Sequence, residues 1–423
     1  MAWALLIISL ASAVLYEIQG EGEGPVVIAH YKFAMYKYGD IYGVFHPELN
    51  VTFSKSLLKK SKSISAYILS PNDIDTKTEF LSNITAYCSN PAIAYHISTN
   101  TSSFVKRVDS TGIYTLYILI CDKYYNYEFT VATVNPYGHL PGDLIMLLPF
   151  YAGISAIYLV LLILWCITLC IFFDFSIPIQ RYWIPTILVL CIIEHSLNFW
   201  YWELINITGS KSLGMLLITV ATKALRDSLG RSLLMVAAKG WGISHETFTS
   251  DLYLIVISGI FYFVLDFAYE TVMKTYPNSQ LWLILLVSLP LIIMNTFIFY
   301  FVFAWFTQIF YRLKLLKQSY KLRLLKQFAT ILGIAGGISV CWTIIELLSR
   351  FFLMIDDIWR WSWLFIGIWD IIFLLLVLGL IVIWRINDKS IYLATSQQIH
   401  NDDEELSKEE EEEKYGIELG RIK

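Results

Sequence analysis

The chain has 423 residues, of which 57% are hydrophobic and only 16% are charged, with a formal net charge of −4. Soluble globular proteins carry roughly 25% charged residues, and the mean hydropathy of this chain is +0.58. This composition excludes a disordered protein and an ordinary soluble enzyme, and the lack of a basic excess argues against a nucleic-acid-binding protein. It predicts a membrane protein, and the more polar first third predicts one domain outside the membrane.

The first residues predict a secretory signal peptide. An apolar run from Ala2 to Leu10 precedes Ala11-Ser12-Ala13, which has the small-residue pattern of a cleavage site. The run is too short to cross a bilayer, so we expect cleavage near Ala13; a short buried helix is the alternative. The expected organisation is a signal peptide at 1–13, a luminal domain at 14–143, a transmembrane domain at 144–385 and an acidic, disordered cytosolic tail at 386–423.

The segment 14–143 predicts an antiparallel β-sandwich. Runs rich in Val, Ile, Tyr and Thr recur without a helical period and are separated by turn sequences such as Pro71-Asn72-Asp73. The glycine and glutamate repeat at Gly20–Gly24 is expected to be a flexible start. The expected strands are Val26–Ala34, Ile41–Phe45, Ser63–Leu69, Ala92–Ile97, Ile113–Cys121 and Tyr124–Val134.

Seven apolar stretches are long enough to span a membrane, which takes about 20 residues. The third is the least apolar, because it carries four charged residues. The stretches are Leu144–Phe173, Tyr182–Trp202, Ser212–Ala237, Leu252–Met273, Leu281–Gln308, Phe328–Ser349 and Trp361–Trp384. The predicted fold class is therefore a membrane α-helical protein, a seven-helix bundle with an N-terminal luminal β-sandwich.

Basic residues in the connecting segments predict the orientation. The segments placed in the cytosol hold Arg181, Lys239, Arg312, Lys314, Lys317, Lys321, Arg323, Lys326, Arg385 and Lys389, whereas the luminal ones hold Lys211, Lys274, Arg350 and Arg360. The N-terminus is then luminal and the C-terminus cytosolic. Four sequons fall on the luminal side, so we predict glycosylation at Asn50, Asn83, Asn100 and Asn206. Cys88 and Cys121, the two luminal cysteines, predict one disulfide.

Ionisable residues inside the spans are energetically costly and mark functional or paired sites. Lys223, Asp227 and Arg231 lie four residues apart and share one helical face, whereas Arg226 points about 100° away from Asp227 and needs another partner. Similar depths in the second, third and seventh spans predict a hydrated polar cavity that opens to the lumen. Its expected residues are Glu194, Lys223, Arg226, Asp227, Arg231, Asp266 and Asp370. A buried ion-pair network that only fixes helix packing, and an ion path, are the alternatives.

Patterns along the membrane half resemble the Golgi-dynamics seven-transmembrane (GOST) family. They are Pro149-Phe150-Tyr151, Glu194 in the second span, the charged third span with its continuation to Ile243, and the last-span entry at Asp356–Trp359 and exit at Val382–Arg385. The exit departs from the family, because Ile386 replaces a proline. The nearest likeness is to Golgi-localised members with a luminal GOLD-like domain. The resemblance implies residence in the Golgi membrane, with cycling through endosomes and the plasma membrane, and a role in endosome-to-Golgi retrograde traffic.

Two further patterns predict contacts. Gly333-x-x-x-Gly337 in the sixth span has the spacing that lets helices pack closely. Ser407 stands between the acidic runs Asp402–Glu405 and Glu409–Glu413, which are typical of a solvated, disordered tail; an acidophilic kinase site and a retrieval signal read by trafficking adaptors are the alternative.

No catalytic motif is present, and His195 has no metal-ligand partner at helical spacing, so we expect no enzyme activity, no cofactor and no metal. The first hypothesis is a membrane-traffic factor whose partners are membrane lipid, a luminal cargo protein and adaptors on the tail, but no nucleic acid. The second is a Golgi cation channel that uses the acidic residues of the spans. The third is a seven-transmembrane receptor for a luminal ligand.

Overall fold

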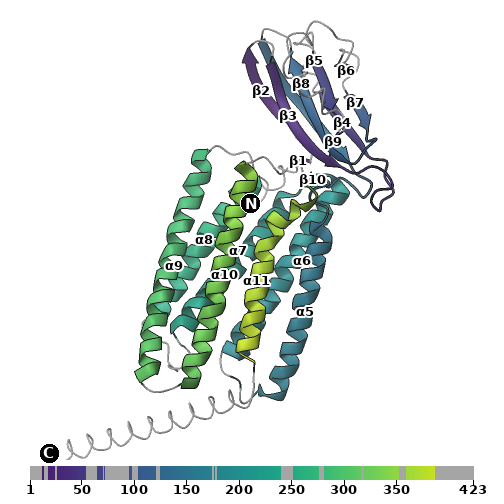
Figure 1. The fold of residues 1–423 in the computed structure, drawn as a ribbon. Helices are drawn as coiled ribbons and strands as arrows, with labels where there is room; N and C mark the ends of the chain where they lie inside the picture. Colours follow the sequence, from purple (N-terminus) through teal and green to yellow (C-terminus); the bar gives the residue numbers. More distant parts are fainter. Residues whose placement is uncertain are drawn as a thin grey trace, which may run out of the picture. The chain divides into compact units, whose positions relative to one another are not determined.

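A computed structural model describes residues 12–13, 18–23, 26–53, 64–69, 71, 95–97, 103–120, 124–173, 176, 179–239, 251–275, 281–315, 319–351 and 359–385. The chain divides into two compact units. The first, called the β unit here, combines residues 1–153 with 196–219 and 341–369. The second, called the helical unit, combines residues 154–195, 220–340 and 370–423. The β unit thus contains one end of several helices as well as the strands (Figure 1).

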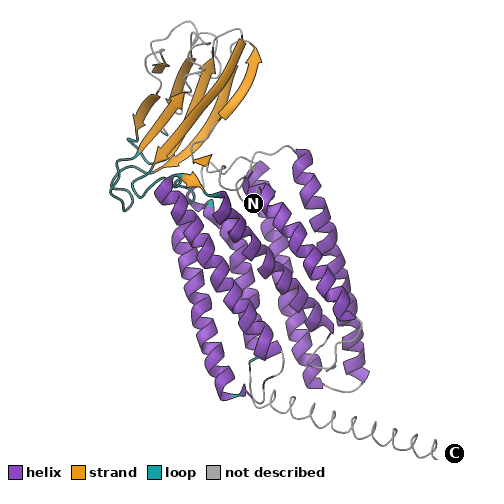
Figure 2. Cartoon of the chain, turned by 180° about the vertical axis from the view of Figure 1, so that it is seen from behind, coloured by secondary structure: helices purple, strands orange, loops and turns teal. Residues whose placement is uncertain are grey.

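The strands form two four-stranded antiparallel sheets (Figure 2). One sheet has the order β2 (Ile18–Glu23), β9 (Tyr124–Val134), β4 (Glu48–Phe53), β7 (Ser103–Arg107). The other has the order β3 (Val26–Met35), β8 (Gly112–Ile120), β5 (Ile64–Leu69), β6 (Tyr95–Ile97). Leu49 and Val131 of the first sheet and Met35 and Leu116 of the second are fully buried, so apolar side chains of both sheets build the core.

The sequence located five of these eight strands. Val26–Ala34, Ser63–Leu69, Ile113–Cys121 and Tyr124–Val134 match β3, β5, β8 and β9, and the expected strand Ala92–Ile97 contains β6. The expected strand Ile41–Phe45 is wrong, because this segment is a loop held against Pro136. The expected flexible start is also wrong, because Ile18–Glu23 pairs with β9 through its backbone.

A short strand pair lies apart from the two sheets. Ser12–Ala13 (β1) pairs antiparallel with Ser210–Lys211 (β10). The expected signal-peptide cleavage near Ala13 would remove β1, and that cleavage stays a prediction.

Seven long helices follow the strands and confirm the expected fold class. They are α5 (Leu147–Ile171), α6 (Ile184–Thr208), α7 (Leu213–Lys239), α8 (Asp251–Thr275), α9 (Leu281–Leu315), α10 (Ser319–Phe351) and α11 (Trp363–Ile383). Six are apolar and long enough to cross a membrane, and α7 is the exception. Its charged residues lower its hydropathy, which means that α7 depends on polar partners inside the bundle.

The lipid-facing character of the helices is clearest on α9. Leu285, Leu286, Leu289 and Ile292 are each more than half exposed on this 35-residue helix. A bilayer rather than water is the solvent for such a surface, because hydrocarbon does not penalise exposed leucine and isoleucine.

The glycine pattern of α10 does not have the expected role. A Cβ atom added at Gly333, Gly336 or Gly337 would meet no heavy atom of the described structure within 4 Å, so the prediction of helix packing there is wrong for this part of the chain. The close approach between α10 and α11 occurs at Gly379, where a Cβ would lie 2.9 Å from Cδ1 of Ile331.

Two asparagines fasten the strands to α6 within the β unit. In the last turn of α6, the Asn206 side chain donates from Nδ2 to the Tyr137 carbonyl (3.2 Å), and its Oδ1 accepts from the Leu140 N–H (3.4 Å). Just after β9, the Asn135 side chain accepts from the Tyr36 N–H (3.0 Å) and donates to the Leu140 carbonyl (3.0 Å). The segment that connects β9 to α5 is therefore tied to the last turn of α6 by side-chain hydrogen bonds.

At the other end of α6, a buried glutamine joins three helices. Gln180 lies in the π-helical turn Ile179–Trp183 before α6. Its carbonyl accepts from the Trp165 indole of α5 (3.0 Å), and its side-chain amide donates to the carbonyl of Trp384, just past α11 (2.8 Å). These contacts fix the ends of α5, α6 and α11 to one another.

Candidate functional site: a buried cluster of charges

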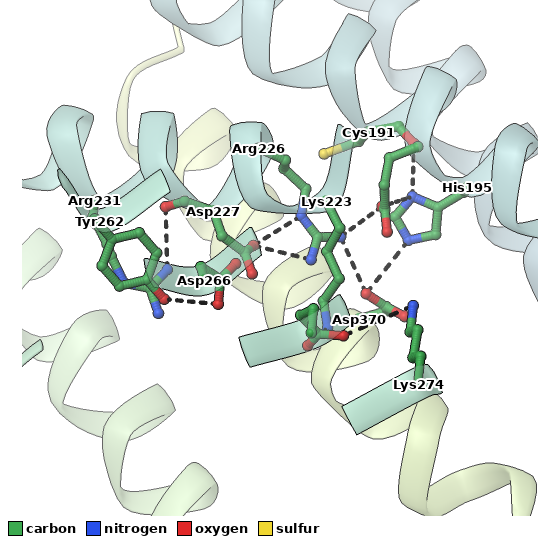
Figure 3. Close-up of polar contacts among 12 residues, drawn as sticks. Cys191, His195, Lys223, Arg226, Asp227, Arg231, Tyr262, Asp266, Lys274 and Asp370 are labelled. Atoms are coloured by element: carbon green, nitrogen blue, oxygen red, sulfur yellow. Dashed lines mark hydrogen bonds and ion pairs between the residues drawn. The ribbon is translucent and has the colours of Figure 1, made fainter. Parts of the chain in front are cut away.

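Ionisable side chains from α6, α7, α8 and α11 meet inside the helical unit (Figure 3). We call this group the charged cluster. Its members are Glu194, His195, Lys223, Arg226, Asp227, Arg231, Asp266, Glu270, Lys274 and Asp370.

Arg226 of α7 is the centre of the cluster. One guanidinium nitrogen, Nη1, lies 2.7 Å from Oε2 of Glu194 and 3.1 Å from Oδ1 of Asp370, which belong to α6 and α11. The guanidinium also contacts the Asp227 carboxylate at 3.0 Å and lies over the Phe373 ring. Arg226 is only 3% exposed, so these contacts replace the water that a charge would otherwise need. Three helices are thus joined by one planar cation.

His195 extends the cluster on the α6 side. Its Nδ1 lies 2.6 Å from the Cys191 carbonyl oxygen and 2.9 Å from Oε2 of Glu194. Both atoms are acceptors, so Nδ1 carries the proton and the ring orientation is fixed. Nε2 faces Asp370 at 3.7 Å, and the ring packs against Tyr158 with 5.3 Å between centroids.

Lys223 connects α7 to α8. Its Nζ forms an ion pair with Glu270, and Lys274, one turn further along α8, lies 3.8 Å from the same carboxylate. The Glu270 carboxylate therefore lies between two cations.

The other face of α7 carries Arg231. Its Nε donates to Oδ1 of Asn295 on α9 (2.9 Å), its Nη1 donates to the Asp227 carbonyl (3.1 Å), and the guanidinium lies 4.0 Å from the Tyr262 ring centroid. The Tyr262 hydroxyl lies 3.4 Å from Oδ1 of Asp266. Because these partners of Arg231 are neutral groups, Arg231 neutralises the carboxylates of the cluster less directly than Arg226 does.

The structure brings the expected residues together but pairs them differently. Arg226 contacts Glu194 and Asp370 on the second and seventh spans, and it also contacts Asp227, from which the helical spacing was expected to turn it away. The spacing of Lys223, Asp227 and Arg231 did not reveal their partners: Lys223 reaches across to Glu270, and the Asp227 carboxylate binds its neighbour Arg226. Asp266 lies one contact away, through Tyr262.

Three members of the cluster lie close enough together to be metal ligands. One ligand atom each from Glu194, His195 and Asp370 lies within 4.8 Å of the others. The Arg226 guanidinium donates to both of these carboxylates, so it occupies the position that a cation would take. The donor set therefore fits an arginine-centred ion-pair network better than a metal centre.

Sequence reasoning missed Lys274, Asn295 and Tyr262. Lys274 was assigned to a luminal loop, although its place four residues after Glu270 is the spacing of a helical ion pair. Asn295 and Tyr262 carry no such signal, because single polar residues in apolar helices have no spacing partner in the sequence.

The remaining predicted sites lie elsewhere. Asn50 is half-buried on β4, and Asn206 is buried in the contact with Tyr137 and Leu140. Burial of the Asn206 side chain argues against the predicted glycan in this arrangement. Cys88, Cys121, Asn83, Asn100 and Ser407 lie outside the described residues.

Comparisons with known proteins assign the chain to a family. A sequence profile described as "GOST, seven transmembrane domain" matches residues 146–390, which is more than half of the chain. Transmembrane protein 87A of Xenopus tropicalis is 25% identical over 284 residues, 67% of this chain and 52% of that protein.

Two further relatives extend the comparison. Transmembrane protein 87B of Homo sapiens is 22% identical over 379 residues, 85% of this chain and 67% of that protein. Membrane protein PTM1 of Saccharomyces cerevisiae (strain YJM789) is 24% identical over 316 residues, 71% of this chain and 59% of that protein. The chain spans about half the length of the frog relative. It belongs to the GOST family of seven-transmembrane proteins.

Proposed function

We propose that this protein acts in membrane traffic at the Golgi, in endosome-to-Golgi retrograde transport or in escorting cargo. In this proposal the N-terminal strand domain is luminal and binds cargo, and the charged cluster lines a polar cavity in the bundle. The tail, with Ser407, recruits adaptors. Family membership supports the proposal.

One structural observation carries it. Helix α6 holds both Asn206, which is tied to the strand domain, and Glu194, which binds Arg226. The two residues lie 12 positions apart in one helix, or about 18 Å at ~1.5 Å per residue. In this proposal α6 carries a residue that contacts the segment after β9 and a residue of the charged cluster on one continuous helix.

The test is a traffic assay in cells that lack the protein. Cells re-expressing the wild-type chain, Asn206→Ala or Thr208→Val are compared for arrival at the Golgi of a membrane cargo that recycles through endosomes. We expect the wild type and Thr208→Val to restore arrival, and Asn206→Ala to restore it only in part. Equal arrival with and without the protein would contradict the proposal.

A Golgi cation channel is the competing function. Glu194, Asp227 and Asp370 all contact Arg226, and Glu270 contacts Lys223. A permeating cation would have to displace these partners, which disfavours conduction. The test measures cation flux into liposomes that contain the purified full chain, either wild type or Asp370→Asn. Flux that this variant alters would make the channel the primary function.

A further inference from the structure

The loop between β3 and β4 presents apolar side chains to the surroundings. Tyr42 is 93% exposed and Val44 is 75% exposed, and Tyr38 and Phe45 are each about half exposed. An exposed apolar cluster of this kind on a folded domain marks a surface that another apolar phase covers. The loop comprises residues 37–46.

The base of this loop is held firmly. Ile41 packs against the small core of Ala34, Tyr36 and Trp359. The Phe45 N–H donates to the Pro136 carbonyl (3.1 Å), and the side chain of Asp40 accepts a hydrogen bond from the Thr111 hydroxyl. At Gly43, an added Cβ would lie 2.0 Å from the Pro136 carbonyl oxygen, so only glycine allows this approach. The exposed side chains are therefore presented by a fixed backbone.

The same base lies where the helices of the β unit leave the membrane. Ile145, just before α5, packs on the core that holds Ile41, and Trp359 of that core lies just before α11. Pro136 precedes Tyr137, whose carbonyl binds Asn206 in the last turn of α6. The loop is thus rooted beside the ends of three membrane helices.

Exposed apolar residues locate the bilayer boundary at this level. On α6, Trp200 and Ile207 are 61% and 66% exposed, so the lipid-facing surface continues to the turn that holds Asn206. Trp361, two residues after Trp359, is also 61% exposed. Tryptophan and tyrosine concentrate where the acyl chains meet the headgroups, and the loop adds Tyr38 and Tyr42 to this belt.

We propose that loop 37–46 inserts into the lipid leaflet on the β-domain side, with Tyr42, Val44 and Phe45 in contact with the upper acyl chains. Lys37 and His46 flank the apolar tip and are exposed, so they meet the phosphate headgroups. A lipid phase fits this surface better than a protein partner does, because its apolar side chains project from a loop whose base adjoins the lipid-facing end of α6. The strand domain is then anchored to the membrane by its own loop as well as by α6.

The experiment uses the full chain in phospholipid nanodiscs. A photoreactive diazirine amino acid replaces Val44 in one sample and Ser103 in another, and mass spectrometry identifies the adducts after illumination. Ser103 is exposed on β7 and pairs with Thr52, whereas Arg107 pairs with Glu48 beside the loop. It thus lies four residues, or ~13 Å at ~3.3 Å per residue, further along the sheet. We expect a lipid adduct at position 44 in several-fold excess over position 103.

Two outcomes would overturn the proposal. A yield of lipid adduct at position 44 that is as low as the yield at position 103 would mean that the loop stays in water. A protein adduct at position 44 would mean that a partner chain covers the loop. The Gly43→Ala variant adds an independent check, because its Cβ displaces the loop from Pro136. In samples with an unchanged melting temperature, we expect this change to reduce the lipid adduct at position 44; an undiminished yield would contradict a loop held by its base.

Discussion

At the scale of single residues, the stability of the bundle depends most on Arg226. Its removal leaves the Glu194 and Asp370 carboxylates on the same side of a buried site without their shared cation. Breaking a buried ion pair on one side costs about 3–5 kcal/mol of unfolding free energy.

We therefore predict that Arg226→Gln sharply lowers the melting temperature and the yield of folded protein. Arg231→Gln serves as the control, because Arg231 is bound by Asn295, a carbonyl and a ring, and its loss leaves no carboxylate directly facing it. The melting temperature in detergent measures both. A control variant as unstable as Arg226→Gln would contradict the central place given to Arg226.

Two substitutions at the Asn206 sequon distinguish the effect of the Asn206 hydrogen bonds from the effect of a glycan. Asn206→Ala removes two hydrogen bonds and leaves the Leu140 N–H and Tyr137 carbonyl unpaired, each at a cost of about 1–3 kcal/mol. Thr208→Val abolishes the same sequon but keeps the Asn206 amide. We expect only Asn206→Ala to lower the melting temperature, and neither change to alter gel mobility. A mobility shift in both variants would show that the site carries a glycan.

Asp143, between the strands and α5, gives a pH dependence. Burial raises the pKa of its carboxyl above the ordinary value of 3.8, so the folded state binds this proton more tightly than the unfolded state. This contribution to stability is present at low pH and is lost as pH rises through the folded pKa.

Accordingly, Asp143→Asn should raise the melting temperature at pH 7, where the wild type must bury a charge. The difference should shrink as the pH falls toward 4, because the carboxyl of the folded wild type then becomes protonated. Melting curves of both proteins between pH 4 and pH 8 test this. A difference that is constant with pH would rule out titration of Asp143 as its cause.

At the scale of elements, replacing the glycines of α10 and of α11 with alanine is expected to change stability in opposite directions. Gly333 and Gly337 on α10 have open space around their Cβ positions, whereas Gly379 on α11 faces Ile331. Alanine stabilises a helix interior by about 1 kcal/mol relative to glycine where nothing clashes.

We expect the double change Gly333→Ala and Gly337→Ala to leave the melting temperature equal or higher, and Gly379→Ala to lower it. Melting curves of the purified chain give the comparison. If the α10 glycines prove to be the sensitive pair, they pack against something outside the described residues.

The elements also show what the sequence can and cannot predict. Long apolar runs predicted six of the helices clearly, because a bilayer demands length and hydropathy that a single sequence displays, and α7 was predicted from the least apolar of the seven runs. Strands β2, β4 and β7 were missed; in β2, four of the six residues are glycine or glutamate, which are uncommon in strands. The β-rich runs that were found carry the alternating side chains that a core selects.

At the scale of the whole molecule, the sequence predicted that the second, third and seventh spans share charged residues, but not that α8 joins them or which atoms pair. Similar depths of Glu194 and Asp370 were sufficient to place both near the third span. The ion pair of Lys223 with Glu270 depends instead on how α8 is turned toward α7, which local spacing does not encode. The path from Tyr137 to Asn206 was equally hidden, because sequence patterns treat a sequon as exposed.

The shared guanidinium has a consequence for how the chain is made. Translation delivers Glu194 32 residues before Arg226, but Asp370 only 144 residues after it. Helix α7 is not among the helices that are apolar enough to cross a membrane, so we expect its insertion to depend on α6, which supplies Glu194. Asp227 is made together with Arg226, and Asp370 follows with α11. A nascent chain that stops before α11 therefore lacks one of the three carboxylates that contact Arg226.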